Sequence, residues 1–143
     1  MSVRTVLNTE GEDISVAVND AAEANGLDPV ALLALLKAES GLNSKAERWG
    51  TRTNEAKAYI RLGEGADLDK LQLLIYDVWL DVSYGMSQRI VAYHSQGDRT
   101  PTVENCLFVR EYVFTHMVED IQAAAAKLAA GITQSTDGTA LGG

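Results

Sequence analysis

The segment from Asp28 to Gly41 constrains the fold most, because both of its ends carry residues that begin and end helices. Asp28 can cap the first turn, and Pro29 suits that turn because its missing N–H would have had no partner there. The alanines and leucines that follow favour a helix, and Gly41 is a common residue just beyond a helix end. We therefore expect a helix that ends near Ser40.

Similar signals recur along the 143 residues, a length sufficient for one domain with its own core. We find no internal repeat and no convincing strand pattern, and the chain has only two prolines. The predicted fold class is therefore all-α. We expect an N-terminal extension (1–12), a helical domain (13–130) and a flexible tail or linker rich in Gly, Ser and Thr (131–143). Within the domain, the further helices are expected over about 13–24, 54–62, 67–83, 85–95 and 103–130.

The charge of the chain limits its partners. The formal net charge is −8, which argues against nucleic acid or an anionic membrane as the main partner, because phosphates are bound by clustered Lys and Arg. The N-terminus lacks the positive start and apolar run of a signal peptide, and no segment has the roughly 18 apolar residues of a membrane span. If the protein works outside a cell, something other than its own signal peptide carries it there.

Residues suited to metal binding or redox chemistry are few. Cys106 stands alone, so the sequence offers neither a disulfide framework nor a thiolate cluster. Because it lies in a helical apolar pattern, we expect a small buried thiol rather than a reactive one. His94 and His116 are isolated, and His94 is expected to be a partly exposed helix residue. We predict no metal and no cofactor.

Glu39 is an acidic residue at an unusual place. It follows Leu32 by seven residues, Leu35 by four and Leu36 by three, so it belongs to the leucine face of its helix. Removal from water and the negative end of the helix dipole both disfavour a charged carboxylate, which would help Glu39 to hold and donate a proton. The alternative is that Glu39, in the last turn, bends out to solvent and has no chemical role.

Two segments carry a resemblance to a known family. The first is AESGLNSKAERW, in which the matching residues are Glu39, Ser40, Gly41, Asn43, Ala46, Arg48 and Trp49. The second is SYGMSQRI, in which Tyr84, Gly85, Met86 and Gln88 take the aromatic, glycine, leucine and glutamine places of the family motif. The chain, over about residues 16–130, resembles the lytic transglycosylase and muramidase families of the lysozyme superfamily.

The resemblance implies a lysozyme-like helical domain with a substrate groove. Such enzymes cut the β-1,4 bond between N-acetylmuramic acid and N-acetylglucosamine in peptidoglycan, and Glu39 would be the acid that protonates the leaving oxygen. In the transglycosylases the muramic acid itself completes the step as a 1,6-anhydro product, so a second protein carboxylate is not required. The two-carboxylate scheme would need one. Asp77 and Asp81 are candidates, although a solvated helix charge is the commoner role, and Glu47 and Glu55 are weaker candidates.

The resemblance also assigns substrate-binding roles, each with a simpler alternative. Gln88 would hydrogen-bond an N-acetyl group, or be a surface glutamine. Gly85 would let the backbone approach the cleft floor, and it would also serve as a plain helix-start glycine. The other candidates are Ser40 near the acid or as a polar helix end, Trp49 as a sugar-stacking ring, and Tyr84 and Met86 as groove-lining or core side chains.

The sequence also departs from the family pattern. Ser87 replaces a methionine, and Gly50 stands where an acidic residue is common. The family's third motif, Ala-Tyr-Asn, has only a superficial counterpart in 92–94, which we place on the same helix as Gln88 and which therefore could not supply the opposite wall.

These departures keep an alternative open: a non-catalytic lysozyme-like module that binds glycan or packs in a larger assembly. The acidic charge fits tethering to a phage tail or virion, where local concentration replaces electrostatic attraction to the wall. The expected place of action is extracellular or periplasmic.

Overall fold

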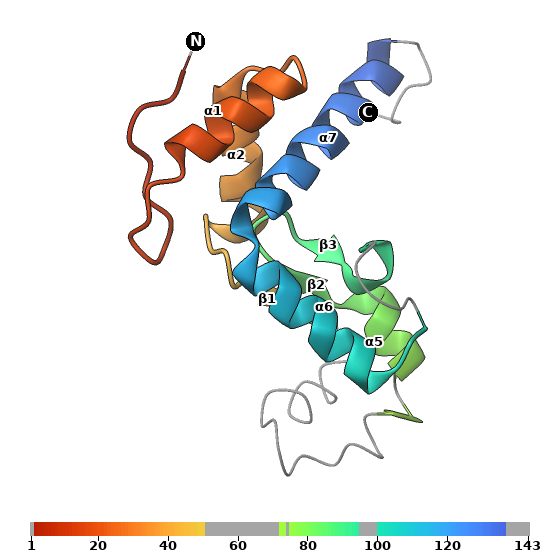
Figure 1. The fold of residues 1–143 in the computed structure, drawn as a ribbon. Coiled ribbons are helices and arrows are strands. Elements are labelled where there is room, and N and C mark those ends of the chain that lie inside the picture. Colours follow the sequence, from red (N-terminus) through yellow and green to blue (C-terminus); the bar gives the residue numbers. More distant parts are fainter. Residues whose placement is uncertain (1, 51–71, 74, 95–99, 137–143) are drawn as a thin grey trace.

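The computed structural model describes residues 2–50, 72–73, 75–94 and 100–136 (Figure 1). These residues form a mostly helical fold with one small sheet. The helices are α1 (Ser15–Ala24), α2 (Pro29–Ser40), α5 (Ile75–Asp81), α6 (Val103–Thr115) and α7 (Met117–Thr136), with a short 3-10 helix η2 (Val91–Tyr93). The strands are β1 (Glu47–Arg48), β2 (Ser83–Tyr84) and β3 (Arg89–Ile90).

The two N-terminal helices form where the sequence predicts them. Asp28 caps α2 by accepting a hydrogen bond from the Val30 N–H at 2.9 Å, and Gly41 ends the helix in the left-handed conformation at φ 62°. α1 begins at Ser15, two residues later than expected, because Asp13 turns its carboxylate to the Ser15 N–H at 2.9 Å. Local capping chemistry therefore sets both ends of α2.

Residues 2–12 pack on the domain rather than extend away from it. The Val3 N–H donates to Asn19 Oδ1 at 2.9 Å, and Leu7 pairs with Asp13 in an isolated antiparallel bridge. Val3 and Val6 pack against the buried residues of α1 and α2. This segment thus belongs to the same folded unit.

The prediction of an all-α fold without strands is wrong in one region. The segment expected to be a helix from Gly85 is instead an antiparallel hairpin, in which Ser83 pairs with Ile90 and Tyr84 with Arg89. β1 pairs with the other edge of β2, so the sheet order is β1-β2-β3. The second family-like segment therefore lies on two strands and the turn between them.

The C-terminal part also differs from the prediction. The helix expected over 103–130 is two helices, because it is interrupted at His116, whose φ of −127° and ψ of 58° are not helical. α7 then continues to Thr136, six residues beyond the expected end, so 131–136 are helical rather than a loose tail. The expected helix at 54–62, Glu55, the start of the helix expected from residue 67 and the tail 137–143 lie outside the described residues.

Two groups of buried side chains form the core. The first lies among α5, the sheet and α6, and comprises Ile75, Val78, Trp79, Val82, Tyr84, Val91, Cys106, Val109 and Val113. The second lies among α1, α2 and α7, and comprises Ile14, Val18, Ala21, Ala22, Leu32, Leu36, Leu42, Met86, Ile121, Ala124 and Ala125. The turn after β2 joins them, because Tyr84 belongs to the first cluster and Met86 to the second.

Candidate active site

Glu39 lines a pocket of about 440 Å³ between the C-terminal end of α2, the sheet and α7. α2 supplies Glu39, α7 supplies Ala123 and Lys127, and η2 supplies Tyr93. The remaining lining residues come from the strands and the turn, and are Arg48, Ser83, Gln88, Arg89 and Ile90. Residues far apart in the sequence thus enclose one concave site.

The last turn of α2 leaves Glu39 at the boundary between core and pocket. Leu32 and Leu36 on the same face are fully buried, whereas Glu39 is half-buried. The helix ends one residue later, at Ser40, and Gly41 follows in the left-handed conformation. The side chain is therefore neither enclosed in the core nor fully solvated.

Gln88 reaches the same pocket from the turn between β2 and β3. Its backbone has a positive φ of 53°, which is uncommon for a residue other than glycine. The side-chain Nε2 donates to the Gly85 carbonyl at 2.9 Å. The Gln88 Oε1 is buried and has no hydrogen-bond partner within the described part of the chain.

Asp120 of α7 holds the turn that carries Gln88 in place. Asp120 is only 3% exposed, and it accepts hydrogen bonds from the Ser87 hydroxyl and from the Ser87 N–H, the latter at 3.3 Å. Burial raises the pKa of Asp120, although the hydrogen bonds from Ser87 and Met86 and the charge of Arg89 oppose that effect. Ser87, which departs from the family pattern, is therefore the donor that this buried carboxylate requires.

Gly85 lies where the turn passes close to α6 and α7. The Gly85 N–H donates to the Ala46 carbonyl at 2.8 Å, which ties the turn to the segment before β1. Its φ is 82°, and a Cβ there would lie 2.3 Å from Asp120 Oδ2 and 2.5 Å from Val113 Cγ1. Only glycine fits both the conformation and the space.

Residues 92–94 do not lie on one helix with Gln88, contrary to what the sequence suggests. Gln88 precedes β3 and Tyr93 is the last residue of η2, so the two are not on one helix. Tyr93 lines the Glu39 pocket while remaining 70% exposed. The expectation that 92–94 share one helix with Gln88 is wrong, because β3 and the 3-10 helix η2 follow the turn of Gln88. His94 was expected to be partly exposed, but it is buried at 1% exposure.

The other predicted substrate-binding residues do not line the pocket of Glu39. Tyr84 and Met86 are fully buried, one in each core cluster, so their side chains are core residues. Burial, together with the charge of Glu47, raises the pKa of Tyr84 far above its usual value. The Ser40 hydroxyl donates to the Leu36 carbonyl at 3.0 Å, and the Trp49 indole N–H donates to Glu47 Oε1 at 2.9 Å while its ring packs against the first cluster.

The candidate second carboxylates also lie away from this pocket. Glu47 has a side chain only 4% exposed and pairs with Arg110 at 3.3 Å, so it is a structural ion pair. Asp81 lies against Gly50, where a Cβ would be 2.1 Å from Asp81 Oδ2. Asp77 is exposed on α5. Among the described residues that line the pocket, Glu39 is the one carboxylate.

Sequence reasoning missed Asp120, Arg89 and Tyr93. The signal for Asp120 was its spacing on α7, three residues after Met117 and four before Ala124, which places a carboxylate on the apolar face. No group of three or more His, Cys, Asp or Glu residues in the described ranges is arranged to hold a metal ion. No helix of those ranges is long and apolar enough to cross a bilayer.

Comparisons with protein-family models, curated proteins and solved structures gave no significant match to this chain.

Proposed function

We propose that this chain is a peptidoglycan-cleaving glycosidase of the lytic transglycosylase type, acting on the β-1,4 bond between N-acetylmuramic acid and N-acetylglucosamine. The observation that carries the proposal is that Glu39 and Gln88 line one pocket. They come from the two separate segments that resemble the family motifs. Chance likeness in two short segments would give no reason for these two side chains to share a concave site.

The chemistry follows from the groups at the pocket. Glu39 donates its proton to the glycosidic oxygen as the bond from that oxygen to C1 breaks. The Glu39 carboxylate then takes the proton of the muramic acid C6 hydroxyl, whose oxygen bonds to C1 and gives the 1,6-anhydro product. This route needs one protein carboxylate, in keeping with Glu39 as the one carboxylate among the described lining residues. Gln88 lines the same pocket, and its side-chain amide suits hydrogen bonding with an N-acetyl group.

A second candidate function is binding of an acidic glycan without cleavage, as a module of a larger assembly. Three cationic side chains, Arg48, Arg89 and Lys127, line the pocket with Glu39. Positive charges stabilise a bound anion, whereas they disfavour the oxocarbenium-like transition state of glycosidic cleavage. Such a module would bind insoluble peptidoglycan and release no soluble fragments.

The deciding experiment measures clearing of purified cell wall by the native chain and by Glu39→Gln. The amide keeps the shape and the hydrogen bonding but cannot transfer a proton, so we expect clearing to fall by about 100-fold or more. Glu111→Gln is the matched control, since Glu111 is exposed on α6 and does not line the pocket, and it should clear the wall normally. Equal clearing by the Glu39 variant would end the catalytic assignment.

Mass spectrometry of the released fragments separates the reaction types. Anhydro-muramic ends are expected for the transglycosylase reaction, and reducing ends would identify a hydrolytic muramidase instead.

The setting we propose is a larger assembly such as a phage tail or virion. A chain with a net charge of −8 gains little from free diffusion to an anionic wall, whereas tethering raises its local concentration there. Sedimentation of the chain with assembled tails should show association, and its absence would count against this setting.

A further inference from the structure

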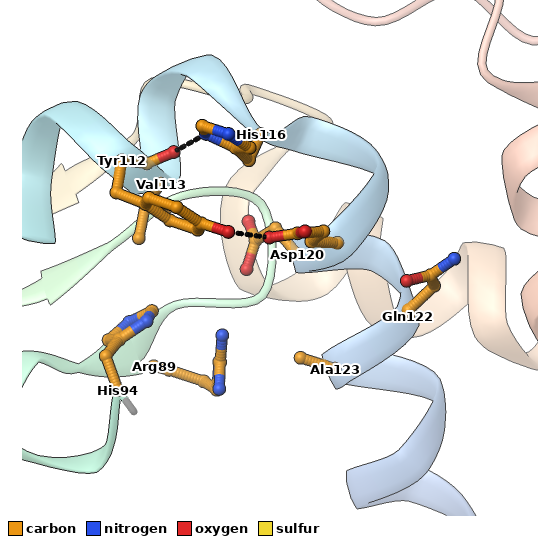
Figure 2. A pocket seen from close by; sticks show the side chains of 9 residues that line it. Arg89, His94, Tyr112, Val113, His116, Asp120, Gln122 and Ala123 are labelled. Atoms are coloured by element: carbon orange, nitrogen blue, oxygen red, sulfur yellow. Dashed lines mark hydrogen bonds between the residues drawn. The ribbon is translucent and has the colours of Figure 1, made fainter. Parts of the chain in front are cut away.

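A second pocket, of about 350 Å³, is shown in Figure 2. It lies beside the pocket of Glu39. Arg89 of β3 and Ala123 of α7 line both pockets, so the two are neighbours along the same strand and helix. The rest of the second pocket is formed by His94, the C-terminal end of α6 and the first turns of α7. A ligand that occupies the first pocket could therefore extend into the second.

Arg89 brings a positive charge into this pocket, where it also acts on the buried carboxylate of Asp120. In Figure 2 its side chain ends in the space bounded by His94, Tyr112 and Ala123. Its Nε is buried and has no hydrogen-bond partner among residues 2–50, 72–73, 75–94 and 100–136. A guanidinium whose buried N–H is unsatisfied gains most from an oxyanion, because it can bind one with two parallel hydrogen bonds.

The acidic groups of the pocket are already engaged within the protein. Asp120 accepts the hydrogen bonds of Ser87, and Glu119 accepts one from the Tyr112 hydroxyl. The ring of Tyr112 stacks on His116 with the ring centroids 3.8 Å apart, which fixes this wall. The two carboxylates would repel a doubly charged phosphate more strongly than a singly charged carboxylate. Of these two oxyanions, the pocket therefore suits a carboxylate better than a phosphate.

We propose that the second pocket binds a carboxylate of the peptide attached to muramic acid, with Arg89 as its partner, while the sugar occupies the pocket of Glu39. This inference rests on the proposed function, because the place of the sugar is taken from it. It deepens that function by making the substrate a glycan that carries peptide rather than a neutral glycan. The Gln122 amide, on the same wall, can add a hydrogen bond to the ligand.

The test is calorimetric titration of the full chain with N-acetylmuramyl-L-alanyl-D-isoglutamine, which has one free carboxylate, and with its methyl ester. We expect the acid to bind about tenfold more tightly than the ester, the value of one charge-assisted hydrogen bond. Arg89→Gln should bind the two forms equally, and Arg89→Lys should keep part of the preference. Arg4→Gln is the matched control, because Arg4 is exposed and lines neither pocket, and it should keep the full preference.

Equal binding of acid and ester by the native chain, or an undiminished preference in Arg89→Gln, would overturn the inference. Should Arg89→Gln not fold, the NMR signal of the native Arg89 Nε–H decides: it must shift with the acid and not with the ester. Inorganic phosphate that displaces the acid at equal concentration would overturn the choice of a carboxylate.

The two proposals fail separately. A native chain that prefers the acid but clears no wall contradicts the proposed reaction alone. A native chain that clears the wall and prefers neither form contradicts this inference alone.

Discussion

Gly85 shows how one residue sets the geometry of the candidate site. It lies in the turn that leads to Gln88, and its positive φ and its contact with Asp120 both require the absence of a Cβ. The same carboxylate holds Ser87, so both Gly85 and Ser87 are placed by one buried side chain of α7. Gln88 is thus positioned by residues that do not themselves line its pocket.

Comparing Gly85→Ala with Gly26→Ala should separate the energetic cost of steric crowding from that of backbone strain. Gly26 also has a positive φ, of 64°, but nothing lies within 4 Å of the position of its Cβ. We expect Gly26→Ala to cost about 1 kcal/mol from backbone strain, and Gly85→Ala about 3 kcal/mol or more, because the new methyl group also displaces Asp120 or Val113. Urea unfolding of both variants measures the difference, and equal losses would show that the turn has room.

Asp120 should make stability depend on pH in a particular direction. Because its pKa is raised on folding from the ordinary value of 3.8, the folded chain binds this proton more tightly than the unfolded chain. This contribution is fully present below the unfolded pKa and is lost as the pH rises through the higher folded pKa. Relative to Asp120→Asn, which keeps an acceptor for Ser87 but does not titrate, the native chain should therefore lose stability from about pH 4 upward.

Urea unfolding of both proteins at several pH values tests this prediction. The difference between their free energies of unfolding should shrink or change sign as the pH rises, and parallel curves would contradict it.

At the scale of the elements, the sequence predicts what local chemistry determines. α2 was confirmed at both ends because Asp28, Pro29 and Gly41 act on their own neighbours. The hairpin was missed because each strand has two residues, too few for an alternating pattern, and because Ser83 to Ile90 is held by β1 and α7 rather than by its own propensities. The break at His116 carries no proline or glycine that would have marked it.

The residues of the candidate site were likewise predicted only where short-range sequence patterns identify them. The family-like segments pointed to Glu39 and Gln88, which the structure brings to one pocket. Tyr84, Met86 and Trp49 could not be assigned to groove or core from spacing alone, because either role suits an apolar side chain. Asp120 and Tyr93 reach the site only through the packing of α7 and the hairpin, which short-range patterns do not encode.

The cap of α2 gives a prediction at this scale. Asp28→Ala removes the acceptor for the Val30 N–H and should cost about 1 kcal/mol of stability. Asp20→Ala is the control, since Asp20 is exposed in the middle of α1, where alanine is the better helix former. Thermal unfolding should show a lower midpoint for the first variant only. Equal midpoints for the two variants would mean that α2 is held by its packing alone.

For the whole molecule, the turn between β2 and β3 couples the two core clusters. Both tryptophans belong to the first cluster, Trp79 as a member and Trp49 packed against it, whereas Leu36 belongs to the second. Because Tyr84 and Met86 anchor one hairpin in both clusters, we expect the described domain to unfold as one unit.

Leu36→Ala tests this coupling. The buried leucine should cost roughly 2–5 kcal/mol on truncation, and the loss should appear equally in tryptophan fluorescence and in circular dichroism. Leu80→Ala, at a leucine 59% exposed on α5, should leave both transitions nearly unchanged. Two separated transitions in the first variant would show that the clusters unfold independently.

Cys106, the single cysteine of the chain, lies in the first cluster, and burial raises the pKa of its thiol to about 12. Alkylating reagents attack the thiolate, and almost no Cys106 thiolate is present while the protein is closed. Each alkylation event must then wait for α6 to separate from the sheet. The rate at which Cys106 is alkylated therefore measures how often this region opens locally, without an engineered cysteine.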